Sequence, residues 1–113
     1  MSNGRISTHI LDTSCGRPAA GIAARLEVQT PAGWHEIGSG VTNNDGRITD
    51  LGPAELKAGN YRIQIDIGPY YRQSKAEAFF SSIWLSFTVA DPEQHYHVPL
   101  LISPFALSTY RGS

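Results

Sequence analysis

The chain has 113 residues, of which 41% are hydrophobic and 17% charged, a composition typical of a soluble globular protein and not of a disordered one. The length predicts a single domain over residues 1–113. The net charge of −1 provides no basic field for nucleic acid or an anionic membrane, and no apolar run approaches the roughly 20 residues of a transmembrane helix. The polar start at residues 1–5 does not resemble a secretory signal, and the single Cys15 cannot form an intrachain disulfide. We therefore expect a cytoplasmic protein that binds neither nucleic acid nor membrane.

Alternation of apolar and polar residues with a period of two, which is typical of half-buried strands, recurs along the chain. In chain order it predicts strands over residues 7–11, 25–29, 34–41, 47–48, 61–67, 83–89, 95–102 and 106–110. Turn signals separate them at residues 15–18, 30–33, 43–46 and 58–60, and the Asp45-Gly46 pair suits a tight hairpin. Pro69 suits a first helical position, so one short helix is expected over residues 69–76. Seven or eight short strands with one helix predict an antiparallel β-sandwich.

The predicted strand at residues 95–102 combines a core face with a chemically active face. Alternation assigns the core face to Tyr96, Val98, Leu100 and Ile102, and the outward face to His95, His97, Pro99 and Leu101. The proline indicates a sheet edge or an irregularity, because it donates no ladder hydrogen bond. Outward apolar residues beside imidazoles indicate contact with another subunit or with a ligand. His9 beside Leu11 repeats this combination near the beginning of the chain.

Arg47 and the closing residues 110–113 are the remaining candidates for a functional site. Arg47 follows the Asp45-Gly46 turn at the start of a strand, which can aim the guanidinium from a rigid base. The closing Tyr-Arg-Gly-Ser is a short aromatic and basic segment, which we expect to be docked on the fold.

Several candidates also have a purely structural interpretation. His35 suits a solvated surface histidine, and Arg111 alone suits a solvated charge. The His95/His97 pair could instead bind a metal, which would require further ligands. Cys15 has no activating base near it in the sequence, so a nucleophilic role is not expected. The residue pattern alone therefore leads to a β-sandwich with a histidine-bearing outer face.

Taken together, these segments resemble the 5-hydroxyisourate hydrolases, which are enzymes of the transthyretin-like family. The resemblance covers nearly the whole chain in the family's order and rests on His9-Ile10-Leu11-Asp12-Thr13, Gly16-Arg17-Pro18-Ala19, Thr42-Asn43-Asn44-Asp45-Gly46-Arg47, Gly59-Asn60-Tyr61-Arg62, His95-Tyr96-His97-Val98-Pro99-Leu100-Leu101, Ser103-Pro104 and Ser108-Thr109-Tyr110-Arg111-Gly112-Ser113. The ending is the most specific segment, since the vertebrate hormone carrier transthyretin shares the fold but lacks it.

The resemblance implies an all-β, transthyretin-like sandwich of two four-stranded sheets with one short helix. It implies a homotetramer, built as a dimer of dimers, with active sites in a channel between the dimers. The implied reaction opens the ring of 5-hydroxyisourate to 2-oxo-4-hydroxy-4-carboxy-5-ureidoimidazoline during urate degradation, with no metal and no cofactor. The carried-over catalytic residues are His9, Arg47 and His97, and the substrate-binding residues are His9, Arg47, Tyr110 and Ser113. Either His9 or His97 serves as the general base, and the role of His95 stays open.

Two segments depart from the family pattern, and two other functions remain alternatives. Residues 103–107 (Ser-Pro-Phe-Ala-Leu) and 79–82 (Phe-Phe-Ser-Ser) differ from the usual family sequences, including the positions Ser81, Ser82, Phe105, Ala106 and Leu107. We expect these differences to affect loop conformation and subunit packing more than the reaction.

The first alternative function is a transthyretin-like carrier of a small hydrophobic ligand, and the second is a structural adaptor with interfacial histidines. Two imidazoles and a guanidinium suit a polar heterocycle better than the iodinated aromatic ligand of a carrier.

Overall fold

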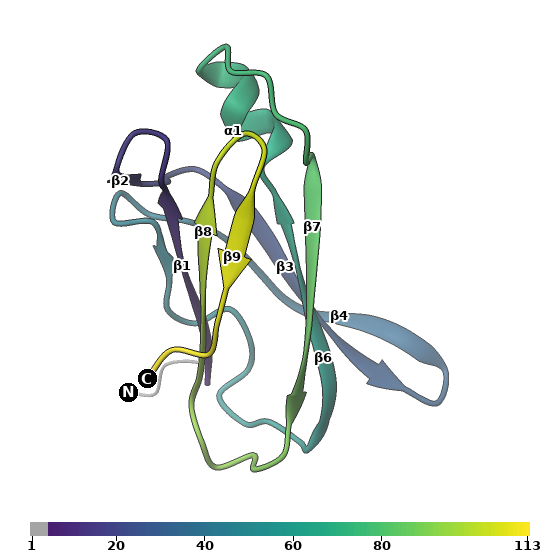
Figure 1. Ribbon diagram of the computed structural model, residues 1–113. Helices are drawn as coiled ribbons and strands as arrows, with labels where there is room; N and C mark the ends of the chain where they lie inside the picture. The colour runs from purple at the N-terminus through teal and green to yellow at the C-terminus, as the bar shows by residue number, and fades with distance from the viewer. Residues whose placement is uncertain (1–4) are drawn as a thin grey trace.

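The computed structural model describes residues 5–113. The expectation that the polar residues 1–5 are no secretory signal therefore falls mostly outside the described residues. Two β-sheets pack face to face, with a short helix, α1 (Gly68–Gln73), at one end of the sandwich (Figure 1). The first sheet has the order β2 (Arg17–Pro18), β1 (Ile6–Asp12), β8 (Tyr96–Ile102) and β9 (Leu107–Thr109), and β5 (Arg47–Ile48) also pairs with β1. The second sheet has the order β4 (Gly33–Val41), β3 (Ala23–Thr30), β6 (Gly59–Asp66) and β7 (Ser82–Val89). The predicted all-β sandwich with one short helix is confirmed.

The first sheet differs from the prediction in strand number and in direction. It holds five strands instead of four, because the two-residue strands β2 and β5 pair with separate parts of β1. The turn predicted at residues 15–18 thus contributes a strand. The sandwich is also not wholly antiparallel, because β1 and β8 run parallel. Most of the chain separates these two strands, so no hairpin fixes their relative direction.

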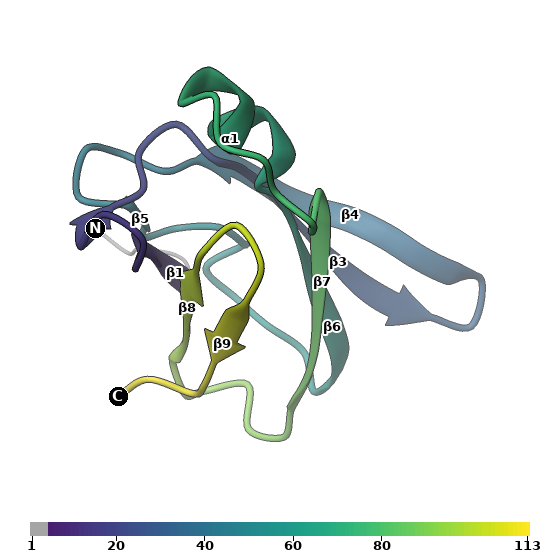
Figure 2. The ribbon, with the colours of Figure 1, turned by 45° about the horizontal axis from the view of Figure 1, so that its top comes forward.

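The two sheets face each other as separate layers (Figure 2), and alternating residues from both fill the space between them, as the period of two predicts. On β6 the odd-numbered side chains are buried, and Ile63 and Ile65 are 0% exposed. Burying one such side chain fully contributes about 1.5–3 kcal/mol, so this face of β6 is a principal source of stability. On β7 the outward Trp84 keeps 43% of its surface exposed, in agreement with the opposite phase predicted for it.

Helix α1 is shorter than predicted and is held by one buried carboxylate. It ends at Gln73 instead of residue 76, since Lys75 adopts the left-handed φ of 60° and stops the helical backbone. The hydroxyls of Tyr70 and Tyr71 donate to Asp12 at 2.9 and 3.2 Å. Asp12 therefore ties α1 to the end of β1. The helix within residues 5–113 is neither long enough nor apolar enough to cross a membrane.

Candidate active site

Strand pairing brings the predicted basic residues together on the outer face of the first sheet. Arg47 on β5 lies opposite His9 on β1, and Ser7 on β1 lies opposite His97 on β8. Since side chains alternate along a strand, Ser7 and His9 project from the same face of β1. Residues that are far apart in the sequence therefore form one continuous patch across three neighbouring strands.

A cavity of about 230 Å³ opens on this patch. It is lined by Ser7, Thr8, Arg47, Thr49, His95, His97 and Ser113. Two of the three predicted catalytic residues and the predicted substrate-binding Ser113 thus share one cavity. His9 is half-buried beside this set, paired with Arg47 and close enough to His97 to influence its charge. The cavity combines hydroxyl, imidazole and guanidinium groups, which suits a polar ligand with several oxygen atoms.

His97 is the most constrained titratable group of the patch. Its Nδ1 lies 2.8 Å from the hydroxyl oxygen of Ser7. Burial holds the pKa of His97 below its usual value of 6.5, and electrostatic interaction with Arg47, His9 and His95 lowers that pKa further. His97 is therefore neutral at physiological pH and can exchange a hydrogen bond with a ligand through Nε2.

The closing segment is docked against β8, as predicted. The Gly112 amide donates to the carbonyl oxygen of His97 at 2.8 Å, and the guanidinium of Arg111 lies 4.5 Å from the centre of the Tyr96 ring. This segment also covers Pro99, which is buried although it was assigned to the outward face of the strand. A Cβ on Gly112 would lie 3.1 Å from Cγ of Pro99 and 2.6 Å from Cδ2 of His97. Only glycine permits this close approach, which brings Ser113 to the cavity.

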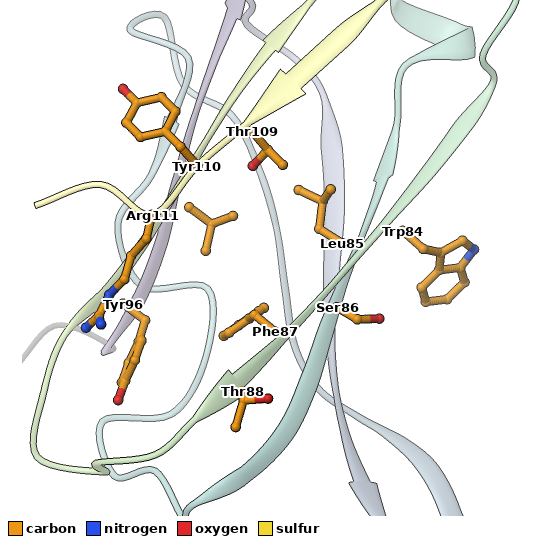
Figure 3. Close-up of a pocket in the computed structure, with 10 residues that line it drawn as sticks. Trp84, Leu85, Ser86, Phe87, Thr88, Tyr96, Thr109, Tyr110 and Arg111 are labelled. Atoms are coloured by element: carbon orange, nitrogen blue, oxygen red, sulfur yellow. The ribbon is translucent and has the colours of Figure 1, made fainter.

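Tyr110 lies outside the histidine cavity. It borders a second cavity of about 300 Å³, whose lining residues are Trp84, Leu85, Ser86, Phe87, Thr88, Tyr96, Val98, Thr109, Tyr110 and Arg111. Figure 3 shows Leu85 and Phe87 directed from β7 toward the terminal segment, whereas Trp84 points away. Tyr110 is 58% exposed, and in the single chain it is not among the residues that line the histidine cavity.

The sequence of residues 6–112 matches the model of the HIUase/Transthyretin family. The chain belongs to this family. It is 42% identical to 5-hydroxyisourate hydrolase of Salmonella typhimurium over 112 residues, which cover 98% of this chain and 82% of the relative. It is 39% identical to 5-hydroxyisourate hydrolase of Mus musculus over 111 residues, covering 96% of this chain and 94% of the relative.

Solved structures similar to this chain include both a 5-hydroxyisourate hydrolase and a transthyretin. The structure of Klebsiella pneumoniae 5-hydroxyisourate hydrolase matches with a TM-score of 0.84 and 36% identity, covering 96% of this chain and 92% of that chain. Transthyretin from Sparus aurata matches with a TM-score of 0.90 and 30% identity, covering 96% of both chains. Backbone similarity therefore does not separate a 5-hydroxyisourate hydrolase from a transthyretin, and the side chains of the cavity must do so.

The segments that depart from the family pattern lie together at the α1 end of the sandwich. The Phe79 amide donates to the carbonyl oxygen of Pro104 at 2.7 Å, which joins the two segments directly. The Ser81 carbonyl oxygen accepts hydrogen bonds from the amides of Ile67 and Gly68 at the start of α1. None of these residues lines the histidine cavity, so their differences act on the helix and the nearby turn.

Sequence interpretation missed one residue in direct contact with the predicted catalytic set, namely Ser7. The available signal was its position two residues before His9, which places both on one strand face. His35 is exposed on β4, as expected of a solvated histidine. Within residues 5–113, no three His, Cys, Asp or Glu side chains are grouped so that they could hold a metal ion.

Proposed function

We propose that this protein is a 5-hydroxyisourate hydrolase that opens the ring of its substrate to form 2-oxo-4-hydroxy-4-carboxy-5-ureidoimidazoline. The observation that carries the proposal is the meeting of His97, Arg47 and Ser113 at one cavity, with His9 directly beside them. The hydrolase names and identities of about 40% over nearly the full chain support it.

The proposed reaction needs a general base that takes a proton from water, a hydrogen-bond donor to the developing oxyanion, and a group that orients the substrate ring. We assign the base and donor functions to His9 and His97, since imidazole exchanges protons near neutral pH. Arg47 presents several N–H donors in a planar fork, which suits a flat ring with several carbonyl oxygens. Ser113 adds a hydroxyl group to the same cavity and is proposed to bind substrate. This scheme uses neither a metal nor an organic cofactor.

We propose that the working protein is a homotetramer, a dimer of dimers, with the cavity facing a channel between subunits. Tyr110 is proposed to bind substrate only in this assembly, because in the single chain its ring borders the other cavity.

The two sheets share one core, which supports a single domain over residues 1–113. The free, exposed thiol of Cys15 supports a cytoplasmic location, since a reducing compartment keeps such thiols reduced.

The alternative function is a transthyretin-like carrier of a small hydrophobic ligand. The close backbone match to transthyretin favours it, and Leu85, Phe87 and Val98 give the second cavity apolar walls. The first cavity contradicts it, because a hydrophobic ligand there would leave imidazole and guanidinium groups without hydrogen-bond partners.

Alanine substitution of the proposed catalytic residues tests the function. His9→Ala, Arg47→Ala and His97→Ala should each lower kcat/KM by ~10²–10⁴-fold, the usual loss for a base or a charge-stabilising donor. Freshly generated 5-hydroxyisourate is followed by its ultraviolet decay against the uncatalysed rate. The control is His35→Ala, which alters an exposed histidine on β4 and should be nearly silent. If all three variants keep near-native kcat/KM, the site is wrong and the carrier becomes the better hypothesis.

A further inference from the structure

The hydrogen bond between Ser7 and His97 distinguishes the two histidines that the proposed function leaves interchangeable. Ser7 is 5% exposed, and His97 Nδ1 is the partner of its hydroxyl within the described residues. A serine hydroxyl has one hydrogen to donate, whereas a neutral imidazole has one N–H donor and one acceptor nitrogen. The direction of this bond therefore fixes which nitrogen of His97 carries the proton.

Donation from Ser7 to His97 satisfies more groups than the reverse. If the hydroxyl donates, its hydrogen and the Nδ1 lone pair are both paired, and the Nε2 hydrogen is left for a ligand in the cavity. If Nδ1–H donates instead, the hydroxyl hydrogen of a nearly buried serine is left without an acceptor, which is costly. Electrostatic interaction with Arg47 on β5, His9 on β1 and His95 just before β8 disfavours the doubly protonated ring of His97, in which the bond to Ser7 would also be reversed.

We propose that Ser7 is a positioning residue that holds His97 in its Nε2–H tautomer, so that His97 donates to the substrate and His9 is the general base. A ring with a proton on Nε2 and its Nδ1 occupied by Ser7 has no lone pair free to accept a proton from water. Two other imidazoles act on His97, those of His9 and His95, and of these two His9 is the one that lies opposite Arg47 in the strand pairing, so the base function is assigned to His9.

This assignment rests on the proposed function and accounts for each proton that is transferred during the ring opening. His9 takes a proton from water as the water oxygen bonds to the ring carbonyl carbon. The electron pair of the C=O bond moves to oxygen, where the Nε2–H of His97 and the Arg47 guanidinium stabilise it. The C–N bond then breaks, the carbonyl re-forms, and the leaving nitrogen receives the proton held on His9. No oxidant, reductant or further reactant is needed.

The tautomer can be measured without substrate, by two-bond proton–nitrogen NMR correlation on protein labelled with ¹⁵N-histidine. At a pH where His97 is neutral, the native protein should carry its ring proton on Nε2. In Ser7→Ala the ring should show exchange between both tautomers, and Ser7→Thr should restore the native pattern because it keeps the hydroxyl. Thr13→Val is the matched control, because it removes a hydroxyl that bonds to β8 at the Ile102 carbonyl, away from His97. A native ring protonated on Nδ1 overturns the proposal.

Glutamine substitution separates a donor from a base in the same enzyme. The amide of Gln carries N–H donors at about the reach of Nε2 but cannot accept a proton from water. His97→Gln should therefore retain at least about tenfold more kcat than His97→Ala, whereas His9→Gln should be as slow as His9→Ala. Ser7→Ala should lower kcat about tenfold, which corresponds to ~1.4 kcal/mol, with KM nearly unchanged. The opposite result, with His9→Gln active and His97→Gln inactive, overturns the assignment. If the native protein fails to open 5-hydroxyisourate, the proposed function is wrong. The NMR measurement needs no substrate, so it still decides whether Ser7 fixes the tautomer of His97.

Discussion

Replacing Gly112 by alanine tests whether the closing segment positions the cavity. The new Cβ would lie 2.6 Å from Cδ2 of His97, whereas carbon atoms in contact are ordinarily ~3.5–4.0 Å apart. The His97 ring yields little, because Ser7 holds it at Nδ1. The terminal segment, and Ser113 with it, must therefore move by roughly 1 Å. A displacement of that size in a catalytic arrangement costs ~10²-fold in rate.

The stability of Gly112→Ala should change much less than its activity. The substitution weakens one hydrogen bond, from the Gly112 amide to the His97 carbonyl, which is worth about 0.5–1.5 kcal/mol. Ultraviolet kinetics on 5-hydroxyisourate and urea unfolding measure the two effects on the same protein. The control is Ser108→Ala, which changes an exposed side chain on β9 opposite Leu101. If Gly112→Ala keeps kcat/KM within about threefold of native while Ser108→Ala is silent, the segment does not position the site.

Three further predictions concern stability, electrostatics and assembly. Asp12→Ala should lower the free energy of unfolding by ~3 kcal/mol in urea, because it leaves the buried Tyr71 hydroxyl without an acceptor. Burial raises the pKa of Asp12, but its hydrogen bonds outweigh burial and hold the pKa below 3.8 in the folded protein. The stability that Asp12 contributes is therefore complete above pH 3.8 and is lost as the pH falls through the pKa of the folded state. A free energy of unfolding that does not fall with pH in this acid range would refute this. Arg47→Met should raise the pKa of His97 toward 6.5 in an NMR titration, since it removes a facing positive charge, and an unchanged pKa would contradict the electrostatic account. Light scattering should give about four times the 12.3 kDa chain mass, and a fully active monomer would exclude the shared channel.

Local patterns predicted the elements of this fold, whereas long-range contacts were beyond them. The alternation around Ile63 and Ile65 determined which face of β6 is buried, because it depends only on strand geometry. The parallel direction of β1 and β8 depends on how two distant segments meet, which no local period encodes. The burial of Pro99 has the same origin, because the segment that covers it comes from the end of the sequence.

The candidate site shows the same limit in its chemistry. Resemblance to the family selected His97 and Ser113 separately, and strand register brought them to one cavity. Tyr110 was selected in the same way, yet the single chain places it at another cavity. Ser7 was missed because its position two residues before His9 indicates only a shared strand face, and its importance arises from its contact with Nδ1 of His97.

The two ends of the sandwich separate stability from chemistry, which explains how a 5-hydroxyisourate hydrolase and a transthyretin can share one fold. At the α1 end, Asp12 ties helix to sheet through buried hydrogen bonds, and none of those groups reaches the histidine cavity. At the other end, the cavity residues lie on the outer face of the first sheet, where Arg47 is exposed and contributes nothing to the core. Substitutions on such a face cost little folding energy. The chemistry of this face can therefore change without disturbing the backbone, in agreement with TM-scores of 0.84 to a 5-hydroxyisourate hydrolase and 0.90 to a transthyretin.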